Sequence, residues 1–316
     1  MSTAFVSHHD SPRHDTGWSH PDHQGRIPAL VRAVYRDMPA LHGHLVQVEA
    51  VPATDDDLLL VHAPEYVRSV RDAVARAAAE GRPVPFQADV VVSDASWDAA
   101  VASVGAALTG VEAVIAGEAR NAFCSARPPG RDAAAGRAGG HSLFNSVAIA
   151  ARHLRERRGA GRVLVMDWGA RAPLGTGPVL AADPGAWVLA IHQHPAPALA
   201  GDAPASPPPL RSFPVPAGAG GDEFAAALRA ALDEAAAWAP EWILLSAGFD
   251  VLAGDPLGGL AVAPRDVHGL TLLLREAADR LCGGRLVSVL EGGYDPAATG
   301  LAVVQHLRAL AGLPAA

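Results

Sequence analysis

Arg162-Val163-Leu164-Val165-Met166-Asp167 is the stretch of sequence that most directly decides the fold. Its apolar residues follow one another without interruption and end in a carboxylate. A short continuous apolar run indicates a strand that is buried on both faces, as in a parallel sheet. The same pattern returns at Trp187–His192, Trp242–Ser246 and Leu286–Leu290, so the second half of the chain predicts several parallel strands.

Helical segments separate these predicted strands. Asp222–Trp238 is rich in Ala and Leu, and its start is acidic, as the dipole of a helix favours. Further helices are predicted at residues 64–80, 96–116, 143–157, 266–281 and 297–310. This alternation predicts an α/β protein with a central, mostly parallel sheet and helices on both faces. We expect residues 1–316 to form one domain, with residues 1–13 as a flexible arm.

Composition and charge narrow the classes of function. The net charge of −8 and the sequence pI near 5.9 argue against binding to nucleic acid. Cys124 and Cys282 lie far apart in the sequence, as is typical of a protein from a reducing compartment. The longest apolar stretch, Ala99–Val111, is too short to span a bilayer, and no signal peptide is recognised. We therefore expect a soluble, cytoplasmic protein without a membrane partner.

Polar residues and glycines gather in the loops that follow the predicted strands. These loops begin at Asp167, His192, Ser246 and Glu291. Ligands of open α/β sheets bind at the carboxyl ends of the strands, so a site is expected where these loops meet. Residues 196–216 are rich in Pro and are expected to form an irregular excursion beside that site.

Several short motifs follow one another along the chain. They are His14 with His20-Pro21-Asp22 and Arg26, Val61-His62 with Tyr66-Val67, Arg127-Pro128-Pro129-Gly130, Phe144-Asn145 with Ala148-Ile149-Ala150, Ser246–Asp250 with Gly254–Leu257, and Glu291–Tyr294. In this order they resemble the histone deacetylase and acetylpolyamine amidohydrolase superfamily, especially its bacterial class II-like members. The resemblance extends from about His14 to the C-terminus and implies the arginase/deacetylase-like fold.

The resemblance also implies a chemistry, the metal-assisted hydrolysis of an amide. In the family an Asp, a His and a second Asp hold a zinc ion, which polarises the acetyl carbonyl and activates a water. A His-His pair serves as general base and acid, and a Tyr donates to the oxyanion. Three protein ligands and an open fourth position are what catalytic zinc normally needs.

This chain departs from the family pattern at most of those positions. Arg131-Asp132 stands where the family has its His-His pair. The family's D-x-D-x-H becomes Asp167-Trp168-Gly169-Ala170-Arg171, so both zinc ligands of that motif are replaced. The third ligand position, Asp250, and the tyrosine, Tyr294, survive.

These replacements lead us to expect a site without zinc. Glycine offers no ligand, and a protonated arginine cannot bind a cation. We expect no metal and no other cofactor, with Asp250 as a vestigial ligand. Because a buried carboxylate without a partner is costly, we expect Arg171 to form a bidentate pair with Asp250 and Arg131 to face Asp167.

A ligand pocket is still expected at this place. In the family's substrate-channel motif Gly140 remains, and His141 replaces the aromatic residue. The expected pocket residues are Arg131, Asp132, Gly140, His141, Asp167, Gly169, Arg171, Asp250 and Tyr294. The arginines favour a small anionic ligand such as a carboxylate. His141 and Tyr294 are the candidates for any remaining catalysis.

The sequence leaves three functions open. The first is a deacetylase-like pseudoenzyme that keeps its pocket for ligand binding or regulation. The second is an active enzyme, of the family or not, with a non-standard site around Arg131, Asp132, His141, Arg171, Asp250 and Tyr294. The third is an interaction protein that pairs with an intact relative. The sequence is also compatible with a homo-oligomer.

Histidines outside the motifs leave two other metal sites open. The first would use histidines of the N-terminus, namely His8, His9, His14, His20 and His23. We instead interpret His20-Pro21-Asp22 as the structural element of the resembled family and expect the other histidines to lie in a flexible arm. The second would be a relocated site that uses His194, His141 or Asp250.

Overall fold

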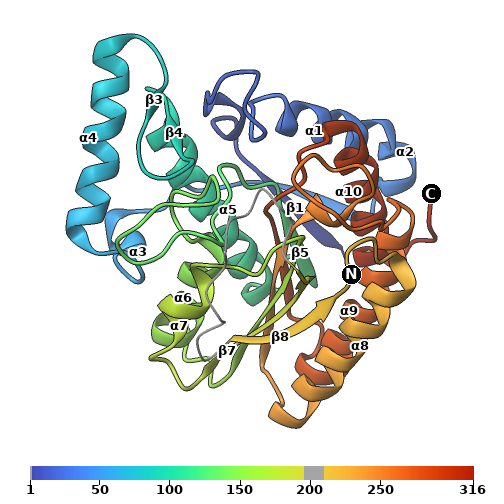
Figure 1. Cartoon of the computed structure of the whole chain (residues 1–316). Helices are drawn as coiled ribbons and strands as arrows, with labels where there is room; N and C mark the ends of the chain where they lie inside the picture. Colours follow the sequence, from blue (N-terminus) through green and yellow to red (C-terminus); the bar gives the residue numbers. More distant parts are fainter. Residues whose placement is uncertain (1, 196–209) are drawn as a thin grey trace.

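An eight-stranded parallel sheet forms the centre of the protein, as the computed structural model of residues 2–195 and 210–316 describes it (Figure 1). From edge to edge the strand order is β2-β1-β5-β10-β9-β6-β7-β8. The strands are β1 (Thr3–Ser7), β2 (Leu45–Glu49), β5 (Asn121–Cys124), β6 (Val163–Trp168), β7 (Ala186–Gln193), β8 (Leu210–Val215), β9 (Trp242–Ala247) and β10 (Leu286–Leu290).

Helices cover both faces of this sheet, which confirms the predicted α/β architecture (Figure 1). One face carries α1 (Arg26–Arg36), α8 (Gly221–Trp238), α9 (Asp266–Cys282) and α10 (Pro296–Leu310), and the other carries α5 (Ser96–Ile115), α6 (Ser146–Arg157) and α7 (Thr176–Leu180). Successive side chains of a strand point to opposite faces. Leu164 and Met166 of β6 therefore enter one core, and Val163 and Val165 enter the other.

The remaining elements lie mostly in the first half of the chain. They are α2 (Met38–Leu41), α3 (Asp55–Leu58), α4 (Pro64–Glu80), an antiparallel pair of β3 (Val84–Pro85) and β4 (Val91–Val92), and the 3-10 helices η1 (Ser11–Arg13) and η3 (Phe249–Val251). α4 and the β3-β4 pair stand to one side of the sheet and share a third apolar core with α5 (Figure 1).

Helix α5 lies deep in the protein because it consists largely of small residues. A Cβ added to Gly105 would collide with the carbonyl of Val51, and one added to Gly110 would lie 2.6 Å from Cys124 Sγ. Within the described residues α5 is the one helix long and apolar enough to cross a membrane, and 78% of that window is buried in the protein, as in a core helix. The helix extends beyond the apolar stretch Ala99–Val111 on both sides.

The structure confirms the predicted strands and helices of the second half, with shifts of a few residues at their ends. The helix predicted from residue 143 begins at Ser146 instead. The reason is a cap: the Asn145 side chain accepts a hydrogen bond from the Ala148 N–H over 3.0 Å. The predicted helix at residues 64–80 has the observed bounds of α4.

The prediction of a flexible arm at residues 1–13 is wrong. Thr3–Ser7 form β1, which pairs with β2 on one side and β5 on the other. Phe5 is buried and stacks on Phe123 at 6.2 Å between ring centroids. The pairing partners of β1 lie far away in the sequence, so a pattern limited to the first residues could not reveal this strand.

The prediction of an irregular excursion at residues 196–216 is wrong where it can be judged. Residues 196–209 lie outside the described residues, and Leu210–Val215 form the edge strand β8. β8 contains Pro214, which lacks an N–H. Proline is tolerated in an edge strand because one side of that strand has no partner to receive a hydrogen bond.

Candidate ligand pocket at the carboxyl edge of the sheet

The candidate site lies at the carboxyl ends of four adjacent strands, β5, β10, β9 and β6. Arg131 lies in the loop after β5, and Glu291 follows β10. Asp250 follows β9, and Asp167 is the penultimate residue of β6. The strands are parallel and adjacent, so their ends bring these four charged residues to one edge of the sheet.

Arg131 is the buried centre of the site, with 5% of its side chain exposed. Its Nη1 donates to Asp167 Oδ1 over 2.6 Å, and its Nη2 donates to the carbonyl of Arg171. The predicted pair of Arg131 and Asp167 is therefore confirmed. A Cβ added to Gly169 would collide with the same guanidinium. Arg131 thus fills the space that a side chain at position 169 would need.

Burial and charge act in opposite directions on this pair. Burial disfavours the charged form of Arg131, but nearby carboxylates, first that of Asp167, outweigh burial and raise the pKa of Arg131 above its ordinary value. Burial raises the pKa of the Asp167 carboxyl to about 7, against the opposing effect of Arg131. The site therefore combines a permanent cation with a carboxyl that titrates near neutral pH.

Glu291 is a second buried carboxyl of the site, and it was not among the predicted pocket residues. Its Oε2 accepts hydrogen bonds from the N–H groups of Gly130 and Arg131 over 2.8 and 3.1 Å. Burial raises its pKa to about 8, although these N–H groups act in the other direction. Glu291 fixes the loop that carries Arg131. The sequence offered one sign of this role, because Glu291, like Asp167, directly follows an apolar run.

Asp132, rather than Asp250, is the counter-ion of Arg171. The Arg171 Nη2 lies 4.0 Å from Asp132 Oδ2, and the Leu174 N–H holds Asp132 Oδ1 over 2.8 Å. Within the described residues no ion pair joins Arg171 to Asp250, so the predicted bidentate pair is wrong. The reason is the loop: Arg131 binds the Arg171 carbonyl and holds that backbone close to the loop of Asp132.

Asp250 is consequently left without the expected partner. It is buried, and in the part of the chain that the structure describes its Oδ1 has no hydrogen-bond donor. Glycines make room for it, since a Cβ at Gly292 would lie 2.9 Å from Asp250 Cγ and a Cβ at Gly248 would lie 2.6 Å from Oδ1. The vestigial ligand position therefore holds a buried carboxylate oxygen whose capacity to accept a hydrogen bond is unused within the described residues.

Gly140 and His141 both have a left-handed backbone, with φ of +56° and +62°. The Gly140 N–H donates to Asp89 Oδ1 over 2.9 Å, and a Cβ on Gly140 would collide with the Asp132 carboxylate. The His141 ring meets Tyr294 edge to face at 5.6 Å between centroids, and its Nδ1 lies 3.5 Å from Asp89 Oδ2. Burial lowers the pKa of His141, so its neutral form is favoured.

Tyr294 is positioned by the N-terminal part of the chain. The Arg26 guanidinium lies 4.8 Å from the centroid of its ring, and Arg26 also donates to the carbonyls of Glu291 and Gly293. The Tyr294 N–H donates to Asp255 Oδ2 over 2.7 Å. Burial raises the pKa of Tyr294, so its hydroxyl keeps its proton and can act as a hydrogen-bond donor.

Asp22 ties the N-terminal segment to the loops of the site. Its Oδ1 accepts from Arg26 Nη1 over 2.5 Å and from Arg127 Nε over 3.1 Å. Arg127 also donates to the carbonyls of Asp22 and His14 over 2.5 and 2.7 Å. Burial acts against the Asp22 carboxylate, but Arg127 and Arg26 outweigh it and lower its pKa. These contacts give Asp22, Arg26 and Arg127 a structural role.

The histidines of the two alternative metal sites all lie within the described residues and do not gather at Asp250. The His20 ring meets the His141 ring at 4.6 Å between centroids, and His14 Nδ1 lies 2.7 Å from Ser96 Oγ. Within residues 2–195 and 210–316, the group of metal-type ligands that lies close together consists of His8, His9 and Glu49, and none forms around Asp250.

Comparison with known proteins decides the family to which these motifs and this fold belong. The family model of the histone deacetylase domain matches residues 20–310. This chain belongs to the histone deacetylase domain family. The match covers every strand of the site, and the resemblance inferred from the motifs is confirmed.

Relatives of this histone deacetylase domain occur in bacteria, plants and animals. A histone deacetylase-like amidohydrolase of Pseudomonas aeruginosa is 31% identical over 91% of this chain and 76% of its own length. Polyamine deacetylase HDAC10 of Homo sapiens is 32% identical over 100% of this chain, which spans 49% of that protein. Among solved structures, the HDA15 HD domain superposes with a TM-score of 0.88 at 25% identity and covers 100% of this chain and 91% of that one.

The residues of this histone deacetylase domain do not fit a zinc ion at the family's position. Three protein ligands are required there. Position 169 is a glycine whose side-chain space holds the Arg131 guanidinium, and position 171 is a second arginine. Asp250 is the one carboxylate left at those three positions. A guanidinium in the place of a ligand adds positive charge where a dication would have to sit.

Proposed function

We propose that this chain is a histone deacetylase-like pseudoenzyme, which binds a small ligand in its pocket without zinc-dependent hydrolysis of an amide. One observation carries the proposal: Arg131 fills the ligand space beside Gly169 and pairs with Asp167 over 2.6 Å. A zinc ion would have to displace this buried, hydrogen-bonded cation, and of the positions 169, 171 and 250 only the last keeps a side chain that can bind it. Displacement would leave Asp167 without its counter-ion, at a cost of several kcal/mol.

The charges of the pocket favour a ligand that carries a carboxylate. Arg171 has 20% of its side chain exposed, and the ion pair it forms with Asp132, at 4.0 Å, is longer than a hydrogen bond. A guanidinium in this state can bind a carboxylate through two parallel hydrogen bonds. Asp250 Oδ1, which has no donor within the described residues, is buried, so it could accept from an N–H group of the same ligand only once the ligand has opened a path to it.

An active enzyme is the competing function, and one observation favours it. His141, Tyr294 and Asp89 lie together, with a neutral imidazole beside a hydroxyl that keeps its proton. These groups can move a proton without a metal. Relatives named as deacetylases, such as the human polyamine deacetylase, make an acetylated amine the first substrate to test.

Zinc content and amide hydrolysis should be measured together. We expect the purified full chain, supplied with zinc, to show no zinc-dependent turnover of acetyl-lysine peptides or acetylpolyamines. The fourfold variant R131H/D132H/G169D/R171H restores the family residues and is expected to gain zinc binding that depends on Asp250. Zinc-dependent turnover by the unaltered chain, abolished by Asp250→Asn, would overturn the proposal. Turnover that is independent of zinc and lost in Tyr294→Phe would support the competing enzyme.

Ligand binding should be tested with a set of small carboxylates in a thermal-shift and calorimetry series. We expect carboxylates to raise the Tm and Arg171→Ala to weaken their binding by at least about tenfold, since a hydrogen bond to a charged group contributes roughly 1.5–3 kcal/mol. Arg162→Ala, at an exposed arginine outside the pocket, is the matched control and should bind as the parent chain does. Equal binding by the two variants would place the carboxylate elsewhere.

A further inference from the structure

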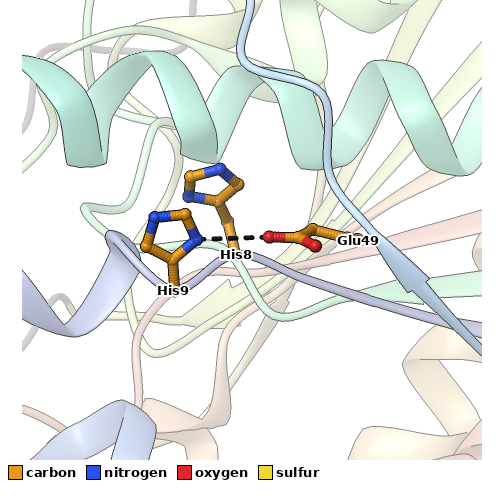
Figure 2. Close-up of side chains that lie close together, drawn as sticks. All are labelled: His8, His9 and Glu49. Atoms are coloured by element: carbon orange, nitrogen blue, oxygen red, sulfur yellow. Dashed lines mark hydrogen bonds and ion pairs between the residues drawn. The ribbon is translucent and has the colours of Figure 1, made fainter.

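Three metal-type ligands meet at the other end of the carboxyl edge of the sheet. His8 and His9 directly follow β1, and Glu49 is the last residue of β2. The parallel register pairs Ser7 with Glu49, so the backbone itself brings these residues together. Figure 2 shows the two imidazoles and the carboxylate side by side. They come from the edge pair of strands rather than from the strands that form the pocket.

The distances suit a shared metal ion. His9 Nδ1 lies 3.2 Å from Glu49 Oε1, and the candidate ligand atoms of all three residues lie within 4.8 Å of one another (Figure 2). Two ligands that bind a tetrahedral ion at about 2.1 Å are about 3.4 Å apart. The side chains of His9 and Glu49 are 70% and 73% exposed and can rotate by the small amount that closes the triangle.

His8 distinguishes this group from an ordinary surface ion pair. Its side chain is only 6% exposed, its ring stacks on that of His9 at 4.3 Å between centroids, and its Nδ1 accepts from the Asp10 N–H over 3.1 Å. The Asp10 carboxylate lies 3.5 Å from His8 Nδ1 and 3.7 Å from His9 Nε2. When a metal ion binds His8 through Nε2, the ring proton moves to Nδ1, which then exchanges the Asp10 N–H for the Asp10 carboxylate as its partner. A carboxylate that accepts this proton is the usual means of orienting a metal-binding histidine.

The group also lines a cavity that leaves room for the ion and for further ligands. The cavity has a volume of about 530 Å³ and includes His8, His9 and Glu49 together with Ile27, Pro28 and Val31 of α1. A tetrahedral ion held by three side chains needs a water or another group in its fourth position. The open side of the site can supply it.

We propose that His8, His9 and Glu49 bind one divalent transition-metal ion, of the zinc class, independently of the deacetylase-like pocket. Two imidazoles and a carboxylate are borderline ligands that suit zinc, copper and nickel better than magnesium or calcium. The bound ion links the end of β1 to the end of the edge strand β2. It therefore stabilises the N-terminal strand against separation from the sheet.

The test is a titration of the metal-free full chain with zinc, followed by calorimetry. We expect one high-affinity ion per chain, an affinity at least tenfold weaker in His9→Ala and in Glu49→Gln, and a zinc-dependent increase in Tm that both variants lose. Cobalt should give the visible absorption of a tetrahedral complex in the parent chain and not in these variants. Both residues are exposed, so neither change should prevent folding.

Two controls keep the outcome decisive. The double variant His42→Ala/His44→Ala removes exposed histidines elsewhere and should bind zinc as the parent chain does. Asp250→Asn tests whether the ion sits in the pocket instead. The proposal is overturned if the parent chain binds no zinc at millimolar concentration, if His9→Ala and Glu49→Gln bind it unchanged, or if Asp250→Asn alone abolishes binding.

Discussion

Two buried aspartates, Asp22 and Asp167, each receive a hydrogen bond from arginine, yet their pKa values move in opposite directions. Asp22 accepts from Arg26 and Arg127, which outweigh burial and lower its pKa. Asp167 accepts from one arginine, Arg131, and burial raises its pKa to about 7. Two guanidiniums outweigh the effect of burial on the pKa of Asp22. The single guanidinium of Arg131, which also interacts with neighbouring carboxylates, does not outweigh it for Asp167.

The contrast separates a structural network from a pocket. Around Asp22 the arginines also bind backbone carbonyls and tie the N-terminal segment to the sheet. Each region leaves buried carboxylate oxygens without a donor within the described residues, namely Asp22 Oδ2 in the first, and Asp167 Oδ2 and Asp250 Oδ1 in the second. The difference lies in the pKa values, so a proton can change the charge of Asp167 near neutral pH while Asp22 stays ionised.

Replacing Arg127 by Met should cause the largest loss of stability. Asp22 would keep only one arginine, and the carbonyls of Ser11, His14 and Asp22 would lose a donor. Breaking a buried pair costs about 3–5 kcal/mol. Urea unfolding should show this loss relative to Arg32→Met, at an exposed position where a change below about 0.5 kcal/mol is expected. A loss below about 1 kcal/mol would mean that Arg26 alone satisfies Asp22.

Arg131→Met should cost less, about 2 kcal/mol at neutral pH, because the Asp167 carboxyl can take up a proton when its partner is removed. The double variant Arg131→Met/Asp167→Asn should recover about half of that loss, since no buried charge remains. Both can be measured by the same urea unfolding. If Arg131→Met proved as damaging as Arg127→Met, the distinction between the two regions would fail.

The two aspartates should also give stability opposite slopes with pH. The raised pKa of Asp167 means that the folded state holds its proton more tightly, so this contribution is present at low pH and is lost as the pH rises through about 7. Glu291 acts in the same direction, up to about pH 8. The lowered pKa of Asp22 gives a contribution that is lost only below the ordinary range of an aspartate.

The free energy of unfolding of the parent chain should fall between about pH 5 and about pH 8. In Asp167→Asn this fall should be smaller by about 1 kcal/mol. Unfolding measured at several pH values with the parent chain as reference checks this. Asp132→Asn, at a carboxyl of the same pocket that Arg131 does not bind directly, is the comparison variant. An unchanged slope in Asp167→Asn would assign the titration to another group.

Arg171→Ala should have the smallest effect on stability, below about 0.5 kcal/mol, because its ion pair with Asp132 is long and partly exposed. The same protein should still lose carboxylate affinity, so the two readouts should separate. Thermal unfolding without ligand measures the first. A large loss of stability would show that Arg171 belongs to the structural network and not to the ligand site.

The sequence predicted those parts of the fold whose signal lies within one element. Leu286–Leu290 is an uninterrupted apolar run and is β10 in the structure. The sequence did not predict β1 because this strand of five residues is stabilised by its pairing with β2 and β5, which lie further along the chain. The sequence did not predict β8 because it contains Pro214, and a proline argues against a strand unless that strand is known to lie at the edge of a sheet.

In the candidate site, too, one contact could be predicted from the sequence and another could not. Arg131 and Asp167 could be paired from the sequence because a carboxylate stands at a strand end and an arginine stands in a loop expected to face it. Arg171 could not be assigned correctly, since the choice between Asp132 and Asp250 depends on where the loop after β6 is held. That backbone contact leaves no mark in the pattern of residue types.

The crowding of Arg131 against Gly169 also has an evolutionary consequence, the order in which substitutions can occur. An aspartate restored at position 169 alone would meet the guanidinium and drive it from its carboxylate. The arginine would have to be replaced first, and that step alone exposes a buried charge. A single change at either position 131 or position 169 is thus expected to destabilise the folded protein. The two positions are therefore coupled: the effect of a substitution at one depends on the residue at the other.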